Sequence, residues 1–173
     1  MGTSWNLGLR WIPDIPVERA ELRMTATTQV APGLFVGLEF NPLDDDLGIL
    51  ANWRVWDEKS DRPALIVGTS SDRIGTPDGR AYYATLSKDL TKATGWPIAP
   101  YVGTAYGDFE DKWVWIGGVS ARLGDRFQST HTWDGHNLHH QIDHKVAEGK
   151  RVGLVVAEQS GKHYVGLSLG LSL

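Results

Sequence analysis

The last ten residues of the chain constrain the fold more than any other segment. They read Y-V-G-L-S-L-G-L-S-L, so apolar residues alternate with small ones after the Tyr. Successive side chains of a strand point to opposite faces, which makes one face aliphatic and the other almost entirely Gly and Ser. A soluble strand usually presents Lys, Glu or Thr to water, whereas a lipid-exposed barrel strand has an aliphatic outer row. The residues that we expect to face lipid are Val165, Leu167, Leu169 and Leu171.

Composition narrows the class of protein. The chain has 173 residues, and we expect a single domain over 1–173. No apolar run approaches the roughly 20 residues of a membrane helix, so contact with a bilayer would require a closed sheet. The net charge of -4 provides no basic footprint, so we expect no nucleic acid partner. The absence of cysteine excludes disulfides and thiolate metal sites.

The same alternation recurs along the whole chain. Segments of about 9 to 11 residues, the length of tilted membrane strands, are separated by turn signals such as Thr76-Pro77-Asp78-Gly79. The best helical candidates, near 17–24 and 89–94, are short. The pattern predicts an all-β fold: an antiparallel transmembrane β-barrel of about twelve strands, or alternatively ten, joined by short hairpins.

A soluble β-barrel that binds an apolar small molecule in its interior would show the same two-residue alternation of apolar and polar side chains. Three features favour the membrane. The last strand lacks charge on its polar side, and the charges on the other polar faces are sparse and mixed in sign. Tryptophans also fall near the segment ends, as in an interfacial belt: Trp5, Trp11, Trp56, Trp96, Trp113 and Trp133.

The chain resembles bacterial outer-membrane β-barrel proteins as a broad class. The resemblance extends over the whole length as a pattern, and stretches such as 76–83 (TPDGRAYY) and 132–135 (TWDG) are similar to those of small, uncharacterised members. It implies a location in the bacterial outer membrane, membrane lipid as a partner, and a role as a small passive pore or a structural barrel. Small solutes or ions would be its other partners, while no feature of the sequence names a partner chain.

The first residues carry no signal peptide, because no basic stretch is followed by an apolar core. An outer-membrane protein needs such a peptide for export. We therefore expect it to have been removed or replaced in this chain.

Charged residues on the polar faces are candidates to line the lumen, where they would set the selectivity for ions or solutes. Alternatively, opposite charges on neighbouring strands would pair and close the lumen. The candidates are Glu21, Arg23, Glu39, Arg54 and Arg122.

Catalysis and metal binding have weaker signals. Ser129 and His131 would share one strand face, as in a membrane hydrolase of the outer-membrane phospholipase class, but no nucleophile motif surrounds them. Five of the six histidines fall between His131 and His144. His140 and His144 would lie about 13 Å apart along a strand, too far to share an ion. We expect no enzyme activity, no metal site and no cofactor.

Overall fold

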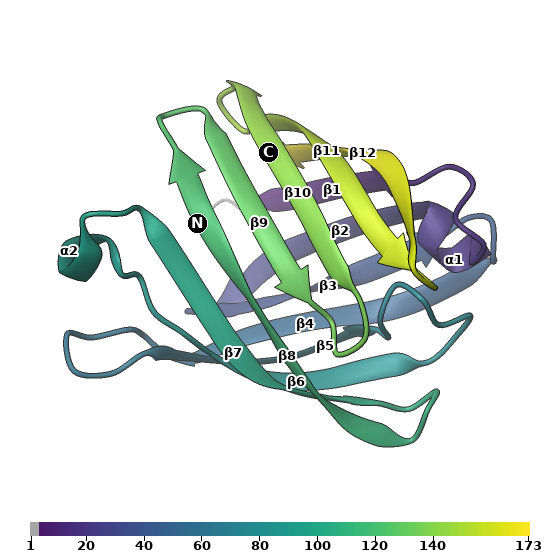
Figure 1. Cartoon of the computed structure of the whole chain (residues 1–173), viewed down its shortest axis with the longest axis horizontal. Helices are drawn as coiled ribbons and strands as arrows, with labels where there is room; N and C mark the ends of the chain where they lie inside the picture. Colours follow the sequence, from purple (N-terminus) through teal and green to yellow (C-terminus); the bar gives the residue numbers. More distant parts are fainter. Residues whose placement is uncertain (1–3) are drawn as a thin grey trace.

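The fold is a closed β-barrel of twelve strands (Figure 1). The structure, a computed structural model, describes residues 4–173. Each strand pairs antiparallel with its neighbours in sequence, and β1 pairs with β12 to close the barrel. The prediction of about twelve antiparallel strands in a barrel is confirmed, and the alternative of ten strands is wrong.

The elements follow the alternating segments of the sequence. The strands are β1 (Trp5–Trp11), β2 (Leu22–Ala31), β3 (Leu34–Asn41), β4 (Asp46–Trp56), β5 (Ala64–Ser71), β6 (Arg80–Ser87), β7 (Ile98–Gly107), β8 (Lys112–Leu123), β9 (Phe127–Trp133), β10 (Leu138–Ala147), β11 (Lys150–Gln159) and β12 (Lys162–Ser172). Two one-turn helices, α1 (Glu18–Glu21) and α2 (Thr91–Thr94), lie where the sequence had its short helical candidates. Residues 1–3, part of the segment searched for a signal peptide, lie outside the described residues.

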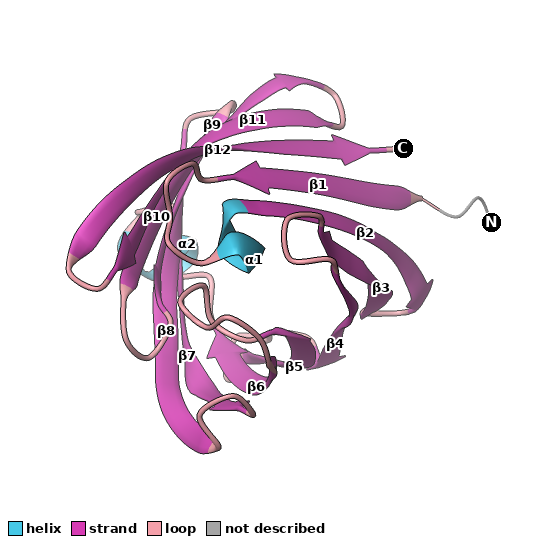
Figure 2. Ribbon diagram, turned by 90° about the vertical axis from the view of Figure 1, so that its right-hand side faces the viewer, coloured by secondary structure: helices cyan, strands magenta, loops and turns pink. Residues whose placement is uncertain are grey.

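The two ends of the barrel differ in their connections. One end carries the start of β1, the end of β12 beside it (Figure 2), and the connections after β2, β4, β6, β8 and β10. The other end carries the connections after the odd-numbered strands. Seven connections have two to four residues, which agrees with the predicted short hairpins, whereas 12–21, 57–63, 72–79 and 88–97 are longer.

The wall is apolar on its outer side. In β12, Val165, Leu167 and Leu169 are 55%, 51% and 51% exposed, whereas Gly166 between them is buried. The register pairs Leu169 with Leu9 on β1 and with Val152 on β11, which extends the aliphatic row sideways. Large exposed apolar side chains also occur on other strands, among them Met24, Leu38, Ile49, Trp53, Leu86, Val102, Trp115 and Ile142.

A small apolar core lies inside the barrel. It joins Ile12, Ile15 and Ala20 of the β1–β2 connection to Val155 and Ala157, which face inward from β11. Gly166 permits this packing, because a Cβ there would collide with the Trp11 carbonyl oxygen and with Ile12. The β1–β2 connection therefore folds into the barrel end.

Two connections together fill that end, and we call them the plug: residues 12–21, which include α1, and residues 72–79. Figure 2 shows α1 and neighbouring loops inside the outline of the barrel. Ile74 packs against the apolar core, and the Gln159 side chain donates a hydrogen bond of 3.4 Å to the Gly75 carbonyl. No helix within residues 4–173 is both long and apolar enough to cross a membrane.

Candidate functional site

A cavity of about 270 Å³, lined by both charged and apolar side chains, lies inside the barrel and is bounded on one side by the plug. Its lining comes from inward-facing strand residues, from both plug segments and from the connections after β7 and β9. The charged residues that matter most to its geometry are Arg10, Arg19, Arg23, Glu39, Arg73 and Glu110.

Arg23 and Glu39 form an ion pair in the barrel wall between β2 and β3. The Glu39 side chain is only 1% exposed, so its charge depends on partners within the protein. Asn41, two residues along the same strand face, donates a hydrogen bond of 3.3 Å to the second carboxylate oxygen. The barrel therefore holds a compensated negative charge beside the cavity.

Arg19 joins the two plug segments. From α1 its guanidinium donates hydrogen bonds of 2.8 Å to the carbonyls of Gly79 and Thr76, and a further one to the Thr76 hydroxyl. The Thr76 hydroxyl donates in turn to the Arg73 carbonyl, at 2.9 Å. Burial lowers the pKa of Arg19, while the carboxylates of Glu39 and Asp46 oppose that shift. One side chain thus fixes the 72–79 loop against α1.

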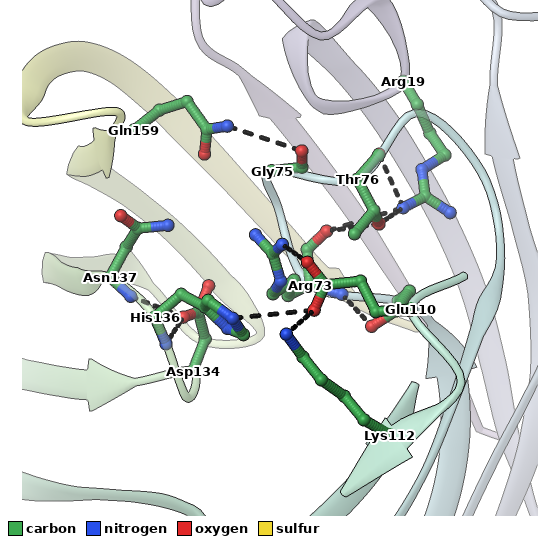
Figure 3. Close-up of polar contacts among 11 residues, drawn as sticks. Arg19, Arg73, Gly75, Thr76, Glu110, Lys112, Asp134, His136, Asn137 and Gln159 are labelled. Carbon is green, nitrogen blue, oxygen red and sulfur yellow. Dashed lines mark hydrogen bonds and ion pairs between the residues drawn. The ribbon is translucent and has the colours of Figure 1, made fainter. Parts of the chain in front are cut away.

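Glu110 gathers three basic side chains at the plug end (Figure 3). Its carboxylate lies 2.6 Å from Arg73 Nη2, 2.9 Å from Lys112 Nζ and 3.5 Å from His136 Nε2. The hydrogen bond from Lys112, followed by that from Arg73, holds the pKa of Glu110 below its usual value. The cluster ties the β7–β8 connection to the plug through Arg73.

Asp134 orders the turn between β9 and β10. Its Oδ1 accepts hydrogen bonds from the backbone N–H groups of His136 and Asn137 at 2.9 and 2.7 Å, and its Oδ2 lies 2.8 Å from His139 Nε2. Burial opposes ionisation, but the hydrogen bond from His139 and the two backbone donors outweigh it, so the pKa of Asp134 is lowered.

The structure separates the five residues that the sequence predicted to line the lumen. Arg23 and Glu39 line the cavity together. Glu21 belongs to α1 rather than to a strand, because the strand begins only at Leu22. Arg54 and Arg122 lie near the other end of the barrel and do not line the cavity. The side chain of Arg54 is 52% exposed and pairs with Asp57, while that of Arg122 is 61% exposed and pairs with Asp89. Both carboxylates lie on connections at that end of the barrel.

Several lining residues were not among the predicted candidates. The position of Arg10 between Leu9 and Trp11 is a signal that could have identified it, because alternation places it on the inward face. Arg19, Arg73 and Glu110 lie on connections. Alternation carries no information there, so only the folded chain reveals that these three residues reach the lumen.

The histidines divide between the two sides of the wall. His139 points inward to Asp134, whereas the register places His131 and His140 opposite each other on the outer side, with their Nδ1 atoms 2.7 Å apart. Ser129 shares the outer side, but within residues 4–173 no hydrogen bond joins it to His131. No group of three or more His, Cys, Asp or Glu within that range is arranged to hold a metal ion.

Comparison with solved structures finds a barrel of the same kind. The NanC porin, in a rhombohedral crystal form, aligns with a TM-score of 0.57 at 12% sequence identity, over 99% of this chain and 99% of that chain. The chain has a porin-like barrel fold. No protein-family model and no curated protein matches the sequence. The likeness confirms the resemblance to outer-membrane β-barrels at the level of fold.

Proposed function

We propose that this protein spans the bacterial outer membrane and acts as a narrow passive pore for small solutes or ions. The observation that carries the proposal is the polarity of the wall. Leu167 and Leu169 lie on the outside, whereas Arg23 and Glu39 line the inside. A barrel dissolved in water would need the opposite arrangement, since exposed apolar area of this extent favours lipid.

The same polarity argues against a soluble barrel that binds an apolar molecule. Such a barrel needs an interior lined mainly by apolar side chains. Here charged groups from both plug segments and from several strands converge on the cavity. An apolar ligand would bury them without supplying hydrogen bonds, which is costly.

The plug would form the constriction of the pore. It is held by one apolar cluster and by the hydrogen bonds of Arg19, while the cavity behind it is open enough to hold a small solute. Arg54 and Arg122 would shape the electrostatic field at the end of the barrel opposite the plug. The residues around Arg23 would shape the field beside the constriction.

Two measurements test this proposal. The purified chain should require detergent and migrate differently on a gel before and after heating, and it should then give small conductance steps in a planar bilayer. A chain that stays monomeric in buffer without detergent would contradict the membrane location. A barrel that inserts but stays silent, including when the plug is loosened by Arg19→Ala, would be a structural barrel and not a pore.

A further inference from the structure

An arginine without a partner lies inside the barrel. Arg10 faces inward from β1 and lines the cavity. Among the described residues, 4–173, its guanidinium takes part in no hydrogen bond and no ion pair, and its Nε is buried. A buried guanidinium usually has a carboxylate or carbonyl partner, because desolvation without compensation is unfavourable. Arg10 therefore has unused hydrogen-bonding capacity directed at the cavity.

A second arginine stands beside it. The register pairs Arg10 on β1 directly with Arg23 on β2, so two positive charges face the same space on neighbouring strands. Like charges in this position repel each other. Arg23 donates to Glu39 through Nη2, but its Nε is also buried and has no partner in the described chain. Glu39 thus pairs with Arg23 only, and the neighbouring Arg10 has no carboxylate partner among the described residues.

The remaining carboxylates around the cavity are occupied elsewhere. Five Arg or Lys and four Asp or Glu line it, so the basic groups are in excess even before the histidines are counted. Glu110 is held by Arg73 and Lys112, and Asp134 by His139 and backbone N–H groups. The fourth carboxylate, Asp72, accepts a hydrogen bond of 2.7 Å from the backbone N–H of Arg73. The positive charge that has no carboxylate partner therefore lies at Arg10, beside the Arg23–Glu39 pair.

We propose that Arg10 and Arg23 bind a small oxyanion, namely a carboxylate or phosphate group, and that solutes carrying such a group are those that enter the barrel. A guanidinium presents its N–H donors in a planar fork that matches the spacing of two oxygens on one acid group. An oxyanion beside the two arginines would accept from the terminal N–H groups of Arg10, which have no partner among residues 4–173, and would reduce the repulsion between Arg10 and Arg23. Passage of such a solute rests on the proposed pore function, whereas binding itself does not.

The test measures stability and binding in the detergent-solubilised barrel. Thermal unfolding is followed by circular dichroism while inorganic phosphate or acetate replaces chloride at constant ionic strength. The wild type should unfold at a higher temperature as either oxyanion is added, because a ligand that binds only the folded state stabilises it. The larger response identifies the acid group, phosphate or carboxylate, that the site prefers.

Arg10→Gln is the decisive variant, and Arg126→Gln, on an exposed turn outside the cavity, is its matched control. Without added oxyanion, Arg10→Gln should be at least as stable as the wild type, because it removes a repelled charge. Its apparent affinity for phosphate or acetate by calorimetry should fall at least tenfold, while that of Arg126→Gln stays unchanged. Should Arg10→Gln fail to fold, Arg10→Lys keeps the charge without the fork and should weaken binding in the same direction.

The outcomes separate the inference from the proposed function. Equal oxyanion responses in the wild type, Arg10→Gln and Arg126→Gln, or a wild-type response no larger than that to chloride, would overturn the inference. Conductance in a bilayer would then still support the pore. Conversely, binding lost in Arg10→Gln from a barrel that never conducts would support the site and refute the pore.

Discussion

At the scale of single residues, the interior depends on one carboxylate. Glu39 is almost fully buried and is the ion-pair partner of Arg23, which in turn faces Arg10. Glu39→Ala would leave two adjacent guanidinium groups without compensation. We expect it to lower the free energy of unfolding by about 3 to 5 kcal/mol, the usual cost of breaking a buried pair from one side.

Unfolding of the detergent-solubilised barrel by guanidinium chloride as denaturant measures this change in the free energy of unfolding. The matched control is Glu148→Ala, since the Glu148 side chain is 93% exposed and pairs only with Lys145 at a hairpin. Equal stabilities of the two variants would show that Glu39 does not compensate Arg23.

Neighbouring residues of β12 test which side of the wall meets lipid. Leu169 is half exposed on the outside, whereas Ser168 faces inward and donates a hydrogen bond of 3.2 Å to Asp143. Leu169→Arg should cost about 2 to 4 kcal/mol if the residue lies near the bilayer midplane, and Ser168→Arg less. Unfolding of both variants in lipid vesicles gives the comparison. A larger penalty for Ser168→Arg would mean that the outer row does not face lipid.

At the scale of elements, the plug can be loosened by a single substitution without disturbing the barrel wall. Arg19→Ala removes the hydrogen bonds from α1 to the 72–79 loop, and hydrogen bonds to a charged group contribute about 1.5 to 3 kcal/mol. The barrel wall does not depend on these bonds. We therefore expect larger or more frequent conductance steps in a planar bilayer while the barrel still migrates as a folded species. Lys92→Ala on α2, which is exposed and makes no such contact, should conduct like the wild type.

Asp134 in the turn between β9 and β10 should make the free energy of unfolding depend on pH. The pKa of Asp134 is lower in the folded state, so its contribution to stability is fully present above the unfolded value of about 3.9 and is lost as the pH falls through the folded value. Stability should therefore decline below about pH 4, and Asp134→Asn should flatten that part of the profile. Denaturation across pH 2 to about pH 6 checks this, with Asp125→Asn on an exposed turn as the control. An unchanged profile in Asp134→Asn would assign the decline to other carboxylates.

At the scale of the whole molecule, the tryptophans mark both ends of the wall. Trp11, Trp113 and Trp133 lie where β1, β8 and β9 meet the plug end, and Trp5 lies at the start of β1 at the opposite end. All four are at least 43% exposed. Amphipathic rings prefer the membrane interface, so lipids brominated near the headgroup should quench their fluorescence more than lipids brominated at the chain end. Negligible quenching at both depths would support a barrel in water.

The sequence by itself determined the wall of this protein. Strict alternation in segments such as 164–173 specifies both the strand and the side on which each residue lies, because the side-chain period of a strand is two. Hairpin turns then bring consecutive strands together, so the antiparallel order and the placement of Arg23 and Glu39 on neighbouring strands followed from local pattern. The strand count and the outer aliphatic row could be predicted for this reason.

Only the tertiary structure decided what fills the barrel. The plug consists of connections, whose sequence has no period, and its position depends on contacts between distant residues such as Arg19 with Gly79 and Ile12 with Ala157. The bounds of each strand also determine at which end of the barrel its charged side chains lie. That dependence separates Arg54 and Arg122 from Arg23, and it leaves Arg10 facing the cavity without a partner in the described chain.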